Sequence, residues 1–488
     1  MNLSILAILL SLALLMYLAY RGVSVLILAP LMALLAVLGS PGTPLLASYT
    51  QVFMKALGGF IALYFPLFLL GALFGRLMES SGAARVIALR IVDWLGADRA
   101  VLAIVLACAV LTYGGVSLFV VAFAVYPLAV ALFQAADVPK RLMPATIALG
   151  AFTFTMTALP GTPAIQNAIP MPFFGTTPFA APGLGVIGGA IMLVLGVWWL
   201  GRRVRQAAAA GEGYGVQADD VMQLERSVRP HALGEGYDVV ELGPQRNGDA
   251  APVVLPGFAV ALAPIVAVVA LNWLFSTQLL PRLDSSYLDS ELYGATRLDA
   301  VRGVWAIIAA LTLSILLLIG LAWRSLPNLR QDLDAGANAA VLPIFNTASQ
   351  VGYGAVIASL VGFALIRDAV LGIAPGQPLI SLSIAVNLLA GITGSASGGM
   401  SIALQTLGSA YLQMGRDAGI SPELLHRVTS IATGGLDALP HNGAVITLLA
   451  ICKLTHRQSY VDILVVAVIT PLAALAAVVL LGTLLGSF

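Results

Sequence analysis

Long apolar runs recur from one end of the sequence to the other, and they limit most strongly what the chain can fold into. A helix of about 20 apolar residues crosses the hydrocarbon core of a bilayer. Only 10% of the residues are charged, whereas a soluble protein carries about 25%. The sequence therefore predicts an all-α polytopic membrane protein surrounded by a lipid bilayer. Because the net charge is +1 and no basic run occurs, we expect no nucleic-acid partner.

Basic residues set the expected orientation, because positive charges in short loops collect on the cytoplasmic side. All basic clusters share one side only if the run at 100–134 is a re-entrant hairpin that opens inward and the run at 378–413 is one that opens outward. The fold is then an inverted-topology arrangement of about ten transmembrane helices, two re-entrant hairpins and two broken helices, with both termini outside. An amphipathic stretch at 82–99 is expected to lie along the membrane interface.

The predicted organisation has five parts. They are N-terminal scaffold helices at 1–53; a first repeat at 54–201, with the inward-opening hairpin 100–134 and a broken helix at 144–172; a cytoplasmic linker at 202–252; a connecting helix and external loop at 253–301; and a second repeat at 302–488, with the outward-opening hairpin 378–413 and a broken helix at 423–451. The linker lacks apolar periodicity, which is typical of a flexible connection. A small folded domain is the alternative, but the linker has little apolar material for a core.

Two short phrases occur in both halves of the chain and indicate an internal repeat. GGVS at 114–117 matches GGMS at 398–401, and ALPGTPAI at 158–165 matches ALPHNGAV at 438–445, in the same order. Because the two hairpins open to opposite sides, the halves form an inverted-topology repeat, which is the arrangement of many secondary transporters.

The second phrase places helix-breaking residues inside an apolar run. Pro160 and Pro163 cannot donate a backbone hydrogen bond, and Pro440 with Gly443 weakens the helix in the second half. Unpaired backbone groups are tolerated at membrane depth only where they are buried in protein or line a watery cavity. Freed N–H groups carry a partial positive charge, so we predict a site for a small organic anion where breaks and hairpin tips meet. Taken singly, each motif could instead be a kink or a packing contact.

The polar residues of these segments are neutral hydrogen-bond donors and acceptors, which suit a carboxylate and hydroxyl groups. The predicted substrate-binding residues are Gly114, Gly115, Ser117, Thr157, Gly161, Thr162, Asn346, Ser395, Ser397, Gly398, Ser401, His441 and Asn442.

Asp437 and His441 are an ionisable pair spaced four residues apart inside one of these motifs. Ionisable groups in membrane segments usually mark ion or proton paths, and histidine titrates near neutral pH. The pair is therefore the candidate for proton coupling. The alternative is a structural hydrogen bond that stabilises the break. His426 and Arg427, in contrast, are expected to form an interfacial anchor.

The sequence carries no motif of a metalloprotein or an enzyme. Its two cysteines have no metal-type spacing with histidine, so neither a metal nor another cofactor is expected. HExxH, GxSxG and Walker motifs do not occur, so the chain is not expected to be an enzyme or an ATP-driven pump.

Four segments carry a family resemblance: LTYGGVSLFVVAFAVYPLA (111–129), IALGAFTFTMTALPGTPAIQNAIP (147–170), GITGSASGGMSIAL (391–404) and GGLDALPHNGAVITLL (434–449). Together they resemble the gluconate permease family of proton symporters, within the wider ion-transporter superfamily. The resemblance implies a multi-pass protein of the bacterial inner (plasma) membrane that takes up a small hydroxycarboxylate with protons. Its substrate would be gluconate or a related sugar acid, glycerate, 3-hydroxybutyrate or D-serine. The resemblance also implies a homodimer and elevator-type alternating access.

Two alternative functions stay open. A sodium-coupled carboxylate symporter is less favoured, because the hairpin tips TYGGVS and TGSASGGMS lack the Asn of the Ser-Asn-Thr signature found in citrate-type members of the superfamily. A cation/proton antiporter would place several carboxylates where the broken helices cross, whereas this sequence places one there.

Overall fold

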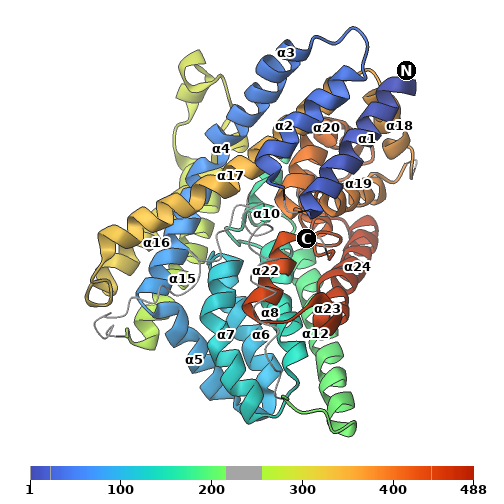
Figure 1. Cartoon of the computed structure of the whole chain (residues 1–488). Coiled ribbons are helices and arrows are strands. Elements are labelled where there is room, and N and C mark those ends of the chain that lie inside the picture. Colours follow the sequence, from blue (N-terminus) through green and yellow to red (C-terminus); the bar gives the residue numbers. More distant parts are fainter. Residues whose placement is uncertain (1, 22, 216–254, 375, 441) are drawn as a thin grey trace.

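The computed structural model describes residues 2–21, 23–215, 255–374, 376–440 and 442–488 (Figure 1). Within these ranges every regular element is a helix, which confirms the all-α polytopic class. Of the described helices, six are long and apolar enough to cross a membrane, and the number rises to eight if each of two sharply bent helix pairs is one span. The ten expected spans included α1 (Asn2–Tyr20) and α2 (Val25–Leu38), whose apolar stretches are somewhat shorter than that test requires.

Two long helices, α4 (Met54–Ser80) and α17 (Leu329–Ser359), pack along each other and cross the view diagonally in Figure 1. α16 (Leu298–Leu321) packs against α4, and α2 packs against α17. The other elements of this group, in which η marks a short π or 3-10 helix, are α3 (Leu45–Ala47), η1 (Ser48–Phe53), α15 (Phe258–Trp273), η4 (Leu274–Leu279), η5 (Leu280–Arg282), η6 (Ser286–Asp289), η7 (Glu291–Tyr293), η8 (Trp323–Ser325) and α18 (Phe363–Leu371).

The first hairpin consists of α6 (Ala100–Tyr113) and α7 (Leu118–Ala135), which pack against each other on either side of the GGVS phrase. It follows α5 (Ala83–Leu95) and η2 (Ala97–Arg99), and the chain bends by 104° between α5 and the helical segment that ends at 113. α5 buries one face, including Ala84, Ile87 and Ile91. The bend and the one-sided burial agree with the amphipathic helix expected at 82–99.

The first broken helix is interrupted where the prolines predicted a break. Its elements are η3 (Lys140–Leu142), α8 (Met143–Ala151), α9 (Phe154–Thr157), α10 (Ile165–Ala168) and α11 (Pro170–Phe174). Within the gap, Gly161 adopts a φ of 82°, a left-handed conformation that favours glycine. α12 (Pro182–Ala209) continues past the expected start of the linker at 202. Most of that linker, from 216 onward, lies outside the described residues.

The second half repeats this order. Its hairpin is α19 (Pro378–Thr393) and α20 (Ala396–Asp417), its broken helix is α21 (Pro422–Ala432) and α22 (Gly443–Ile451), and the last elements are α23 (His456–Leu464), η9 (Val465–Ile469) and α24 (Thr470–Leu485). An added Cβ on Gly399 of α20 would collide with the backbone of Ala390 in α19, so glycine permits this close packing. In Figure 1 the first hairpin lies in the lower half of the view and the second in the upper right, with α10 between them.

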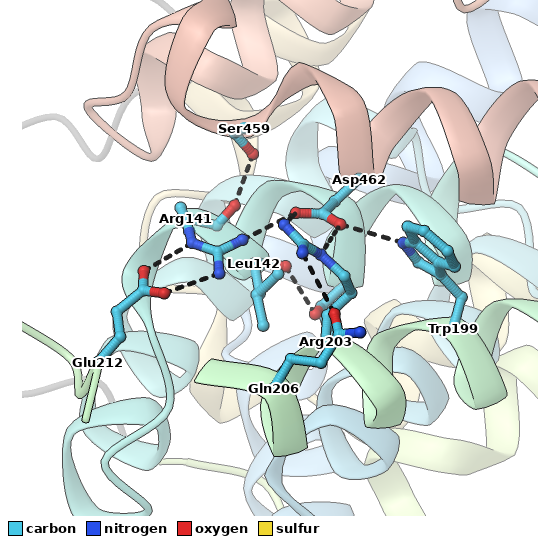
Figure 2. A network of polar contacts seen from close by, with 9 residues as sticks. Arg141, Leu142, Trp199, Arg203, Gln206, Glu212, Ser459 and Asp462 are labelled. Carbon is cyan, nitrogen blue, oxygen red and sulfur yellow. Dashed lines mark hydrogen bonds and ion pairs between the residues drawn. The ribbon is translucent and has the colours of Figure 1, made fainter. Parts of the chain in front are cut away.

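Asp462 of α23 is buried and holds several basic segments together (Figure 2). Arg141 Nη1 lies 3.2 Å from one of its carboxylate oxygens and Arg203 Nε 2.8 Å from the other, while Trp199 donates its indole N–H at 3.0 Å. These contacts place η3, the C-terminal part of α12 and α23 on the same side of the molecule, as the charge rule requires. Arg141 also donates two hydrogen bonds to Glu212, which lower the pKa of that carboxyl group.

We expect Asp462→Asn to lower the free energy of unfolding by about 1–3 kcal/mol, because two arginines would lose their shared counter-ion in a partly dry site. The loss stays below that of a fully buried pair, since Arg141 and Arg203 keep some contact with water. Thermal unfolding of the purified protein in detergent measures it. The control is Asp368→Asn, which removes an exposed pair with Arg367; equal shifts for the two variants would contradict a stabilising role for Asp462.

Candidate functional site

A cavity of about 230 Å³ lies between both hairpin tips, the first helix break and the helices α4, α16 and α17. The hairpins contribute Thr112, Gly115, Val116, Ser117, Leu118, Ser395 and Ser397, and the first broken helix contributes Met156, Pro163, Ala164, Ile165 and Gln166. The remaining wall consists of Val25, Leu67, Phe68, Gly71, Ala72, Leu311, Ala339, Ala340, Pro343, Asn346, Thr347 and Gln350. None of these lining residues is charged. Among the described residues, no cluster of three or more His, Cys, Asp or Glu side chains is placed to hold a metal ion.

Each hairpin tip starts a helix at the cavity. In the first tip Gly115 adopts a φ of 96° where the chain reverses, and Ser117 precedes α7 without capping it through its side chain. In the second tip Gly394 has a φ of 64°, and Ser395 Oγ accepts a hydrogen bond from the Gly398 amide at 3.2 Å. Since the first N–H groups of a helix lack partners within it and carry partial positive charge, both tips favour an anion.

The protein itself satisfies the backbone groups that the first break sets free. The Tyr113 hydroxyl donates to the Pro160 carbonyl at 2.7 Å, and Asn272 Nδ2 donates to the Gly161 carbonyl at 3.0 Å. The Gly161 amide donates in turn to the Pro178 carbonyl at 2.9 Å. Partners from α6, α15 and the segment before α12 therefore fix the break, and the residues that follow it form part of the cavity wall.

Arg427 and His426 of α21 are completely buried, so the expectation that they form an interfacial anchor is wrong. Arg427 donates two hydrogen bonds to the Ala180 carbonyl, at 2.7 and 3.0 Å, and one to Asn167 Oδ1 at 3.3 Å. His426 Nε2 lies 3.1 Å from the same Asn167 oxygen, and its Nδ1 lies 2.6 Å from the Thr176 hydroxyl. Because an amide oxygen only accepts, His426 donates to Asn167 through Nε2.

The second break lies behind the tip of the second hairpin. Asn442 Nδ2 donates to the Gly394 carbonyl at 2.7 Å, and the Thr433 hydroxyl donates to the Ala396 carbonyl at 2.6 Å. Asp437 is half-buried in this break. The cavity lining contains none of the described residues between α21 and α22. The second break therefore supports the tip, whereas the first break contributes to the cavity wall.

The cavity brings together Gly115, Ser117, Asn346, Ser395 and Ser397 from the predicted substrate-binding residues. The other predicted residues that the structure describes are outside its lining: Gly114, Thr157, Gly161, Thr162, Gly398, Ser401 and Asn442. Some of them hold the backbone in place, as the contacts of Gly161 and Asn442 illustrate. His441 lies outside the described residues, so its roles in binding and in proton coupling with Asp437 stay predictions.

Four further polar residues of the lining are among the neutral donors and acceptors that the sequence offers, but not among the predicted substrate-binding residues: Thr112, Gln166, Thr347 and Gln350. Thr112 Oγ1, Gln166 Oε1 and Gln350 Oε1 are buried and have no hydrogen-bond partner in the described part of the chain. Each unsatisfied buried group costs about 1–3 kcal/mol, which a bound ligand can offset. An available signal was the presence of amide side chains inside apolar runs, where polar groups usually have a function.

The sequence is similar to known proteins along its length. A family model for GntP family permeases matches residues 1–173. A protein of Bacillus subtilis (strain 168), named "Uncharacterized transporter YxjC", is 45% identical over 485 residues, which cover 98% of each chain. A permease family and a transporter relative agree with a polar cavity enclosed by apolar helices.

Gly398→Ala tests whether the Gln350 amide contributes to ligand binding in the cavity, because an added Cβ at Gly398 would collide with that amide. We expect the displaced amide to weaken ligand binding about 3- to 10-fold, which corresponds to one lost hydrogen bond. The measurement is the change in unfolding temperature on addition of small hydroxy acids, the ligand class that the sequence predicts. Gly320→Ala, which faces open space, is the control. If Gly398→Ala keeps the wild-type response, the Gln350 amide makes no contribution to ligand binding.

Proposed function

The chain belongs to the GntP family of permeases, and on that premise we propose that it imports a small hydroxycarboxylate together with protons. As a family member it is a secondary transporter with several membrane-spanning helices. The proposed substrates are gluconate or a related sugar acid, glycerate, 3-hydroxybutyrate and D-serine. The observation that carries this proposal is the uncharged cavity between the hairpin tips, where polar side chains from both tips, the first broken helix and α17 meet within an otherwise apolar wall.

The hydroxyl part of the substrate fits the unpartnered groups of the cavity. Gln166 and Gln350 each present a buried amide oxygen that needs a hydrogen-bond donor. A hydroxyl group donates, whereas an ionised carboxylate only accepts. The two residues come from the first broken helix and from α17, so a hydroxylated ligand could join both sides of the cavity.

The carboxylate part of the substrate fits the starts of α7 and α20. Ser117 and Ser395 precede these helices at the cavity, where backbone N–H groups and the helix dipole attract an anion. Ser397 adds a further hydroxyl from the second tip. The volume of about 230 Å³ is smaller than the roughly 300–1,000 Å³ of pockets for drug-sized ligands, which favours a small acid.

Alternating access is proposed to follow from the duplicated order of hairpin and broken helix. Two halves built as an inverted-topology repeat can expose one site to either side of the membrane in turn. In this proposal the hairpins and broken helices move as an elevator past α4, α16 and α17. The family resemblance supports a homodimer in the bacterial inner membrane as the working form.

Proton coupling is assigned to Asp437, with His441 as its partner. Asp437 is half-buried in the second break, and Asn442 of the same break bonds to the backbone of the second hairpin tip. A change of charge at this break can therefore act on the tip that lines the cavity. A carboxylate at membrane depth is typical of a proton path.

Uptake by the purified protein in lipid vesicles tests the function directly. We expect at least one of labelled gluconate, glycerate, 3-hydroxybutyrate and D-serine to accumulate when an inward proton gradient is imposed. Because the buried acceptors of the cavity can bind a hydroxyl group, 3-hydroxybutyrate should inhibit labelled uptake about 3- to 10-fold more strongly than butyrate. Accumulation driven only by a sodium gradient would indicate a sodium-coupled carboxylate symporter. Sodium exchange for protons without any acid would indicate an antiporter, and no uptake of any acid would refute the proposal.

Asp437→Asn separates coupling from substrate binding. We expect this variant to exchange internal for external substrate at about the wild-type rate, because the cavity is intact, but to lose accumulation against a gradient. Exchange and gradient-driven uptake are measured in the same vesicles. Asp417→Asn, at the exposed end of α20, should keep both activities. Full accumulation by the Asp437 variant would remove this carboxylate from the coupling role.

A further inference from the structure

Arg427 carries a charge in the interior of the protein and has no carboxylate partner among the residues that the structure describes. Its side chain is 0% exposed, and none of the ion pairs in the described part of the chain includes it. Its hydrogen bonds go to neutral oxygens, among them the Ala180 carbonyl and Asn167 Oδ1. These dipoles stabilise the guanidinium group but leave its positive charge uncompensated.

An uncompensated charge at such a place is expensive. Burial of a charged group away from water is unfavourable unless it is paired, and ionisable residues within membrane segments are usually functional. Neutral donors could satisfy the same carbonyl groups without this cost. The charge itself is therefore the property of Arg427 that requires an explanation.

The position of Arg427 links this charge to the cavity. Asn167 contacts Arg427 through Oδ1 and donates through Nδ2 to the Thr162 carbonyl at 3.0 Å. Pro163 and Gln166, which lie between these two residues in the chain, line the cavity. Arg427 is absent from the lining, so its link to the cavity runs through Asn167 and the segment at 162–167.

We propose that Arg427 is a positioning residue that makes the neutral cavity selective for an anion, acting through Asn167 and the backbone of the first break without touching the ligand. The inference rests on the proposed function, because it requires an anionic substrate. A bound carboxylate supplies the negative charge that the surroundings of Arg427 lack.

The predicted effect is a change in selectivity. At the effective dielectric constant of about 20 that describes protein sites, one buried charge near the cavity changes the affinity for a monovalent anion by about tenfold. It leaves the affinity for an uncharged ligand of the same shape nearly unchanged. A residue that only held the break in shape would alter both affinities alike.

The experiment compares each acid with its primary amide. The probe pairs are gluconate and gluconamide, glycerate and glyceramide, and 3-hydroxybutyrate and 3-hydroxybutyramide, used as competitors of labelled uptake in vesicles. We expect Arg427→Gln to lower the preference for the acid about tenfold, and Arg427→Lys, which keeps the charge, to retain it within about threefold. Arg367→Gln, which removes an exposed arginine, should leave the preference unchanged.

Two results would overturn the inference. One is an unchanged acid preference in a folded Arg427→Gln variant, with folding checked by thermal unfolding. The other is a wild-type protein that binds amide and acid equally well. If Arg427→Gln does not fold, Asn167→Asp is tested in its place. A carboxylate beside Nη1 of Arg427 would neutralise the charge while the guanidinium group stays in place. An unchanged acid preference in this variant would also overturn the inference. Failure of wild-type protein to take up any acid would instead refute the proposed function.

Discussion

Backbone groups that lose their helical partners inside a membrane must find new partners within the protein, and the centre of this molecule depends on that requirement. At the first break, Asn272 reaches the Gly161 carbonyl from α15, and in the segment before α12, Arg427 reaches the Ala180 carbonyl from α21. At the second break, Asn442 holds the tip of the second hairpin. Long polar side chains from distant helices thus tie the hairpins and the broken helices into one body.

The same requirement divides the buried polar side chains into two groups. Asn167 and Asn442 donate to backbone carbonyls and are satisfied by protein. Thr112, Gln166 and Gln350 keep unpartnered atoms in the described structure, and all three line the cavity. Desolvated groups without partners are unfavourable, so their gathering at one place marks where a ligand completes the structure. Other buried side chains, among them Ser314 and Thr447, also lack a partner in the described part of the chain, so the convergence of three such groups on one cavity, rather than their existence, favours a ligand there.

The sequence predicts well where a helix is interrupted, but it predicts poorly how deeply a side chain is buried in the protein. Pro160 and Gly161 act on their own helix, so the first interruption could be predicted from spacing alone. The burial of Arg427 could not, because its partner Ala180 is 247 positions away, and an arginine near the start of a helix resembles an interfacial residue. The structure brings the first break to the cavity and places the described residues of the second break behind a hairpin tip, because order along the chain does not determine which break faces the cavity and which supports a tip.

The cavity wall on α17 bears on how binding and movement are linked. Asn346, Thr347 and Gln350 reach the cavity from α17, which packs along α4, and the Thr347 hydroxyl lies 3.4 Å from the Ser397 hydroxyl of the second hairpin. If the hairpins slide past α4 and α17, this contact and any ligand contact with Gln350 must be exchanged for others. A ligand shifts the balance between two arrangements only by its difference in affinity for them. Polar groups on both sides of the sliding surface provide such a difference, so occupancy of the cavity itself would help to decide which arrangement the transporter adopts.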